Sequence, residues 1–163
     1  MRFTVAVIAL LPAILLSGCD RYGDAKKAVK AALIDPESAQ FDDVTAGKEA
    51  GIVCGLVNAK NRMGGYIGRM PFYTRNGVVY MTASGPTRSD LRLLNATSVT
   101  DEKLEWEKRW MEIQVGCDFI GSIGRYCPDR YKARLEMEPG LCEAWNKPNG
   151  GLQAALEAVG EKD

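Results

Sequence analysis

The sequence predicts an α+β domain with an N-terminal helix, a small antiparallel sheet of three to four strands, a packing helix that carries two tryptophans, and a disulfide-tied C-terminal extension. Three observations predict this class. Apolar residues at helical spacing precede Pro36, short apolar segments flank Asn76 and Gly77, and Trp106 and Trp110 recur at helical spacing. Residues 25–163 are therefore expected to form a single domain, with an irregular extension from about residue 118.

The first helix is expected over residues 25–34. One side carries an apolar stripe of Ala28, Val29, Ala32 and Leu33, and lysines occupy the other side. Asp24 is the expected N-cap. Asp35 is followed by Pro36, and the helix is expected to end there because a residue before proline disfavours the helical conformation.

Short apolar segments then predict the strands, over residues 41–46, 51–58, 71–75 and 78–83. Both faces of the second segment are mostly apolar, so we expect it at the centre of the sheet. Asn76 and Gly77 separate the last two segments, and this pair is the strongest short signal for a two-residue hairpin. Residues 84–99 are polar and are expected to be irregular.

The second helix is expected over residues 100–115, with Thr100 as its N-cap. Its apolar stripe comprises Trp106, Trp110, Ile113 and Cys117, and is widened by Leu104, Met111 and Val115. Such a stripe predicts core packing under the sheet, with Cys117 just past the helix. Residues 121–150 are expected to form turns, and a short helix is expected over 152–159.

The N-terminus is typical of an export signal. Met1 and Arg2 supply a positive start, and the apolar run over 3–16 is shorter than the roughly 20 residues that a membrane-spanning helix needs. The following residues Leu16, Ser17, Gly18 and Cys19 resemble the lipobox of bacterial lipoproteins. Residues 1–18 are therefore expected to be a lipoprotein signal peptide.

The lipobox resemblance implies a membrane anchor. In such proteins the cysteine thiol receives a diacylglycerol, so Cys19 would become the lipidated N-terminus and residues 19–24 a short tether. The expected location is the bacterial cell envelope, facing the periplasm, with the membrane as a partner through the lipid. Asp20 resembles a retention signal and slightly favours the inner membrane.

The remaining cysteines are Cys54, Cys117, Cys127 and Cys142, an even number that is typical of a disulfide framework in an exported domain. No pair has the CxxC spacing of zinc or thioredoxin-like sites. We expect Cys54 to pair with Cys117, because a central strand and the end of the packing helix must meet across the core. Elimination then pairs Cys127 with Cys142.

The amino-acid composition limits the kinds of catalysis and binding that the chain can support. The chain has no histidine, which removes the commonest general base and the imidazole metal ligands. Its 21 basic and 21 acidic residues balance, so a nucleic-acid partner has no electrostatic support. We predict no catalytic residue, no metal site and no cofactor. Asp42 and Asp43 are expected to lie at a solvated strand edge.

Two dense motifs resemble a group of small bacterial envelope proteins. They are the DPxSAxF pattern at 35–41 and the VCGxVNAKNxxGGYxG pattern at 53–68. The resemblance implies a helix, a small antiparallel sheet and a final helix with a tryptophan and a cysteine. It covers roughly residues 28–117. Leu56 departs from the acidic residue that often follows Cys-Gly in the group, and no activity is implied by the resemblance.

The connection after the second strand concentrates candidate partner-binding residues, namely Asn58, Asn61, Arg62, Tyr66 and Arg69. Tyrosine and arginine are enriched at binding hot spots, whereas the asparagines could instead satisfy turn backbone. The sequence favours a non-enzymatic protein that binds another envelope component, protein or glycan, such as an inhibitor or immunity-type protein. Alternatives are a structural accessory of an envelope assembly or secretion apparatus, and a carboxylate-dependent cell-wall hydrolase.

Overall fold

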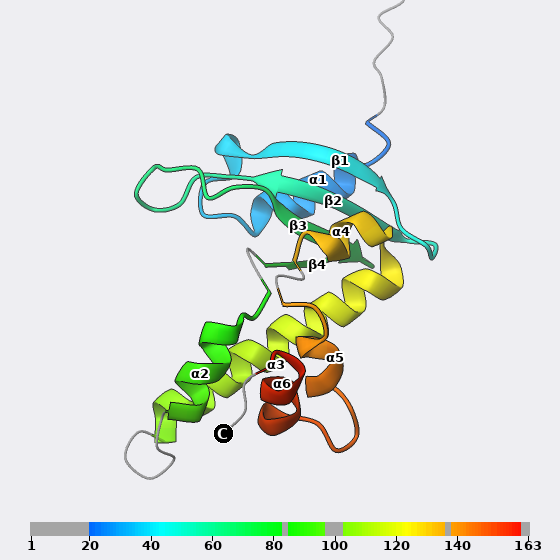
Figure 1. The fold of residues 1–163 in the computed structure, drawn as a ribbon. Helices are drawn as coiled ribbons and strands as arrows, with labels where there is room; N and C mark the ends of the chain where they lie inside the picture. The colour runs from blue at the N-terminus through cyan, green and yellow to red at the C-terminus, as the bar shows by residue number, and fades with distance from the viewer. Residues whose placement is uncertain (1–19, 83–84, 97–102, 136–137, 161–163) are drawn as a thin grey trace, which may run out of the picture.

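The structure is a computed structural model that describes residues 20–82, 85–96, 103–135 and 138–160. Within these ranges the chain forms a four-stranded antiparallel sheet and six α-helices, which confirms the α+β class (Figure 1). The elements are α1 (Gly23–Ala31), a 3-10 turn (Pro36–Ser38), β1 (Gln40–Ala46), β2 (Ile52–Asn58), β3 (Met70–Arg75), β4 (Val78–Met81), α2 (Arg88–Ala96), α3 (Lys103–Tyr126), α4 (Asp129–Ala133), α5 (Leu141–Trp145) and α6 (Leu152–Ala158). The expected signal at 1–18 and Cys19 lie outside the described residues. No described helix is long and apolar enough to cross a membrane.

The sheet has the strand order β1-β2-β3-β4, so β2 lies in its interior, as the sequence predicts. Asn76 and Gly77 join β3 to β4 with φ angles of 52° and 80°. These angles belong to the mirror-image turns that match the twist of paired strands, and the predicted hairpin is confirmed. The β1–β2 register shifts between Asp42 and Thr45, where Asp43 has a φ of 50°, so β1 contains a bulge.

The two faces of the sheet bound two apolar cores. On one face, Val29 of α1 packs with Val57 and Phe72. On the other face, Leu56 and Tyr73 belong to a larger core built with α3 and the helices that follow it. In Figure 1, α2, α3, α5 and α6 gather at the β4 side of the sheet, away from α1. The sheet therefore separates α1 from the rest of the helices.

The first helix begins two residues earlier than predicted, at Gly23, and ends at Ala31 rather than at residue 34. Asp24 is not its N-cap, because that position is held by Tyr22, whose side chain makes no capping bond. Pro36 instead starts the short 3-10 turn, which Asp35 caps by accepting a hydrogen bond from the amide of Ser38 at 3.3 Å.

The helices beyond β4 differ most from the prediction. Residues 88–96, expected to be irregular, form α2, which buries Leu91 and Leu94. The pairing of Thr87 with Asp90, whose carboxylate accepts from the Thr87 amide at 2.7 Å, is a capping-box signal that was available in the sequence. The second predicted helix continues past residue 115 to Tyr126, so Cys117 lies inside α3 rather than after it. The C-terminal extension contains the short helices α4 and α5 as well as α6.

The disulfide pairing differs from the prediction. Cys54 bonds to Cys127 and Cys117 bonds to Cys142, with Cα–Cα distances of 5.9 and 4.9 Å. Cys127 lies ten positions after Cys117, which is about 15 Å along the axis of α3 at 1.5 Å per residue. Disulfide geometry requires Cα atoms within about 7 Å, so the cysteine that follows the C-terminal end of α3 reaches β2 and Cys117 does not.

The two tryptophans of α3 pack against the larger apolar core, but they lie among helices and not under the sheet as predicted. Trp106 and Trp110 are half-buried and stack with ring centroids 5.1 Å apart. Trp110 also packs against Trp145 of α5, at 4.5 Å between centroids. The first half of α3 extends beyond the sheet toward α2 and α6 (Figure 1), so the stripe meets helices and not strands.

Candidate binding surfaces

The β2–β3 loop, residues 59–69, carries four of the predicted partner-binding side chains, and two asparagines, Asn58 at the end of β2 and Asn61 in the loop, hold its shape. Asn58 Oδ1 accepts from the amide of Gly68 at 3.0 Å. Asn61 Oδ1 accepts from the amides of Met63 and Gly65, at 2.9 and 3.1 Å. Side-chain amides that satisfy turn backbone are a structural device, so both asparagines have the architectural role that the sequence left open.

Tyr66 is anchored to the sheet at one end of its ring. Its hydroxyl accepts from Nε2 of Gln40 at 3.1 Å, and the ammonium of Lys60 lies 5.6 Å from its ring centroid. The side chain is nevertheless 47% exposed. Arg69 forms an ion pair with Asp42 at 3.1 Å across the strand edge. Tyr66 is therefore oriented by its neighbours and still presents part of its ring to solvent.

The tip of the loop is apolar as well as basic. Arg62 is exposed, Met63 is 94% exposed and Ile67 is 46% exposed. Four of the five predicted residues thus lie on this loop and Asn58 ends the strand before it, and two apolar side chains that sequence reasoning did not single out, Met63 and Ile67, lie on the same loop. Whether a partner contacts this loop stays a prediction.

A second surface, which the sequence did not predict, is a groove of about 950 Å³ between β4 and α3. We call it the β4–α3 groove. One wall is β4 at the edge of the sheet, with Val79, Tyr80 and Met81, and the other is the outer face of α3, with Met111 and Val115. Open pockets of this size and apolar content are the usual form of binding sites.

The wall formed by α3 exposes three large apolar side chains. Leu104, Met111 and Val115 are 82%, 61% and 63% exposed. Their predicted membership of the buried stripe is wrong, because a helix turns by about 100° per residue and places them about 100° to 180° around the helix axis from Trp106 and Trp110. The helix therefore has two apolar faces, and only one is covered by the rest of the described chain.

Stacked aromatic rings form the floor of the groove. Tyr73 of β3 stacks on Tyr80 of β4 at 4.7 Å and on Phe119 of α3 at 5.7 Å between ring centroids. Tyr73 is buried, and this burial raises the pKa of its hydroxyl. The Tyr73 hydroxyl is therefore neutral at pH 7, and Tyr80 remains 40% exposed.

The charges that line the groove are mostly acidic. Asp90, Glu107, Glu112 and Asp118 contribute four carboxylates, and Lys108 and Arg109 contribute the two cations. Arg109 is already paired with Glu105 at 3.0 Å, and Lys103 lies 3.8 Å from Glu107. An apolar strip with an acidic rim favours a ligand that is apolar and carries positive charge.

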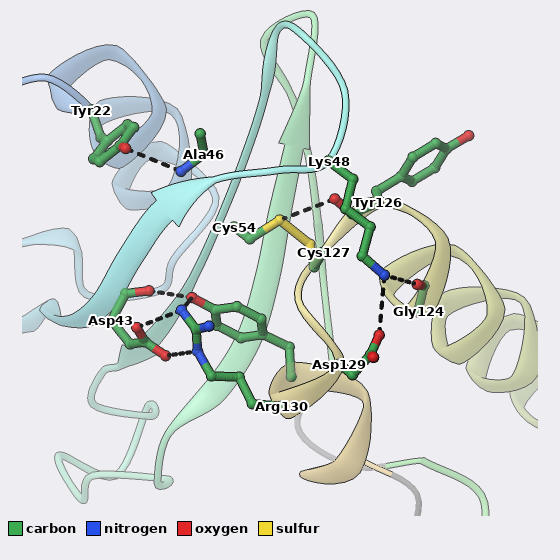
Figure 2. The surroundings of a disulfide bond; sticks show 11 residues. Tyr22, Asp43, Ala46, Lys48, Cys54, Gly124, Tyr126, Cys127, Asp129 and Arg130 are labelled. Atoms are coloured by element: carbon green, nitrogen blue, oxygen red, sulfur yellow. Dashed lines mark hydrogen bonds and ion pairs between the residues drawn. A yellow bond between two sulfur atoms is a disulfide. The ribbon is translucent and has the colours of Figure 1, made fainter.

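The strongest displacement of pKa values occurs elsewhere, at the bulge of β1. Arg130 of α4 donates to both carboxylate oxygens of Asp43 and lowers the pKa of that carboxyl group (Figure 2). Tyr131 donates its hydroxyl hydrogen to the Asp43 carbonyl oxygen, and burial raises the pKa of this tyrosine. These hydrogen bonds join two residues of α4 to the bulge, so the cluster holds α4 to the sheet.

The described residues contain no group of three or more histidine, cysteine, aspartate or glutamate side chains that could hold a metal ion. No family model, no characterised protein and no solved structure matches this chain. The resemblance to lipoproteins and to small envelope proteins therefore stays a prediction from the motifs alone.

Proposed function

We propose that this protein is a lipid-anchored, non-enzymatic protein of the bacterial cell envelope that binds a segment of another envelope protein in the β4–α3 groove. The observation that supports the proposal is the outer face of α3, where Leu104, Met111 and Val115 are more than half exposed beside a floor of aromatic rings. Contiguous apolar surface of this kind marks interaction sites in folded proteins.

The edge of the sheet suggests the form of the bound segment. In the described part of the chain β4 is the last strand of the sheet, so one of its edges has no strand neighbour. An exposed edge can accept an extended segment by β-strand addition, in which backbone hydrogen bonds give affinity and alternate side chains enter pockets. The acidic rim adds a preference for lysine or arginine next to the apolar residues of that segment.

Photocrosslinking in cells tests this proposal. A photoreactive residue in place of Met111 would lie in the groove, one in place of Tyr66 would lie on the β2–β3 loop, and one in place of Glu157 would lie on the exposed side of α6. We expect one discrete protein adduct from position 111 and none from 157. An adduct from position 66 alone would move the binding surface to the loop, and no adduct from either would contradict binding.

The anchor has its own test. Replacement of Cys19 by serine should abolish labelling with radioactive palmitate and leave residues 1–18 uncleaved, so that the variant migrates as a larger, unlabelled precursor. A variant that is processed and partitions like the parent would show that the lipobox prediction is wrong. This outcome is independent of the crosslinking result, so anchoring and binding are tested separately.

A further inference from the structure

Only one peptide bond separates Cys19 from Asp20, the first described residue, which is hydrogen-bonded to the folded domain. The Asp20 carbonyl oxygen accepts from the Gly23 amide at 2.9 Å, and its carboxylate accepts from the Tyr22 amide at 3.2 Å and from Nζ of Lys26 at 2.9 Å. The Tyr22 hydroxyl accepts from the Ala46 amide of β1 at 3.0 Å (Figure 2). Asp20 is thus bonded to α1, which in turn is bonded to the sheet.

This geometry fixes the distance between the proposed lipid and the domain. Consecutive Cα atoms are about 3.8 Å apart, so Cys19 is one peptide unit from a residue held by three hydrogen bonds. Residues 19–24, expected as a tether, therefore include the first residues of α1. A lipid on Cys19 would hold the Asp20 end of the domain at the bilayer surface.

The outer side of α1 has the character of a membrane-contacting surface. Val29 of α1 is buried against the sheet, whereas Lys27 of α1, Arg21 before the helix and Ile34 after it are exposed, Ile34 at 65%. Asp24 is the one acidic residue of α1, and it is also exposed. Lys30 is half-buried, and neither it nor Lys27 forms an ion pair with another described residue. The acidic Asp20 is already paired with Lys26. Lys27 and Lys30, without ion pairs, outnumber the one carboxylate of α1, so this side of the helix suits a surface of anionic phosphate headgroups.

We propose that α1 lies against the membrane, with Arg21, Lys27 and Lys30 facing anionic lipid headgroups, and that the α3 side of the domain, with the β4–α3 groove, faces away from the bilayer. The proposal rests on the lipid anchor of the proposed function. The α1 core and the α3 core occupy opposite faces of the sheet, so contact through α1 leaves α3 free for a partner. Anchoring and orientation would then act together to present the groove.

Amine labelling of the tethered protein tests the orientation. The chain from residue 19 onward contains every described residue, and its other four cysteines are in disulfides, so the Cys19 thiol can be coupled to maleimide lipid in vesicles. We expect tethering to phosphatidylglycerol vesicles to slow modification of Lys27 and Lys30 severalfold relative to the untethered protein. Lys147, exposed between α5 and α6, should react at an unchanged rate. Salt at 0.5 M should reduce the protection, because it shortens the screening length to a few ångströms.

Matched variants complete the test. Lys27→Gln should weaken the protection of Lys30 on these vesicles, whereas Lys147→Gln should leave it unchanged. The proposal would be overturned if tethering left the labelling rates of Lys27 and Lys30 unchanged. It would also be overturned if tethering lowered the labelling rate of Lys147 more than the rates of Lys27 and Lys30. Chemical coupling bypasses processing in the cell, so a failed palmitate assay or a failed crosslink would contradict the proposed function without affecting this result.

Discussion

Arg130 binds Asp43 across 87 positions of sequence, through nitrogen–oxygen distances of 2.6 and 2.9 Å. The contact joins α4 to the bulge of β1, where Asp43 has the left-handed φ of 50°. Next to it, the Cys54–Cys127 disulfide joins β2 to the residue after α3 (Figure 2). One charged contact and one covalent bond thus fix the same end of the helical layer to the sheet.

The first prediction concerns pH. Arg130 lowers the pKa of Asp43, so the carboxylate contributes stability that is fully present above the unfolded value of about 3.9 and is lost as pH falls through the folded value. Asp43→Asn should therefore lower the melting temperature at pH 7 and make little difference near pH 2. Asparagine, like aspartate, adopts a positive φ readily, so the substitution does not strain the backbone at position 43. Both side chains are more than a third exposed, so we expect a loss below about 1 kcal/mol.

Urea unfolding of the two proteins at pH 7 and at low pH provides the measurement. Asp42→Asn is the matched control, because Asp42 is the preceding residue and makes a more exposed ion pair, with Arg69. Equal losses for the Asp43 variant at both pH values would contradict the linkage.

The second prediction is the disulfide map. Non-reducing peptide mapping should find Cys54 joined to Cys127 and Cys117 joined to Cys142. Chain-entropy estimates give a stabilisation of about 4 kcal/mol for the longer loop and about 3.5 kcal/mol for the shorter one. The double replacement of Cys54 and Cys127 by alanine should thus destabilise the protein more than the double replacement of Cys117 and Cys142. Recovery of a Cys54–Cys117 peptide would show that the structure is wrong here.

The third prediction separates the two apolar faces of α3. Trp110→Ala removes stacking with Trp106 and Trp145 and should cost about 3 kcal/mol, the lower end of the range for buried aromatic residues, since Trp110 is half-buried. Met111→Ala, one position along and 61% exposed, should change the free energy of unfolding by less than about 0.5 kcal/mol. Chemical denaturation measures both. Similar losses would mean that the outer face is packed in solution.

The fourth prediction tests the β2–β3 loop. Asn61→Ala leaves the amides of Met63 and Gly65 without their acceptor and should cost about 1 kcal/mol. Arg62→Ala, next in sequence and exposed, should leave the melting temperature unchanged. If Tyr66→Ala and Arg62→Ala reduce crosslinking of a partner while the melting temperature holds, the loop is a binding surface. If Tyr66→Ala lowers the melting temperature and Arg62→Ala has no effect on either measurement, the loop is architectural.

Local signals in the sequence determined the class and the first half of the fold. The Asn76-Gly77 turn and the continuous apolar run of β2 each fix their segment through short-range signals, and both predictions are confirmed. The first helix, in contrast, ends at Ala31, before the residue that precedes Pro36. The positions of the disulfide cysteines and the loop that carries Tyr66 were also readable, because residue type alone identifies them.

Tertiary structure alone decided how the helices meet the sheet. Residue type does not distinguish Cys117 from Cys127 as a partner for Cys54, and only the observed length of α3 shows which of them reaches it. Likewise, Leu104 and Trp110 both belong to the apolar pattern of α3. A helical pattern separates their two faces but cannot say which face other helices will cover, since burial depends on contacts between residues far apart in the chain. The exposed groove is therefore a property of the packing and not of any segment.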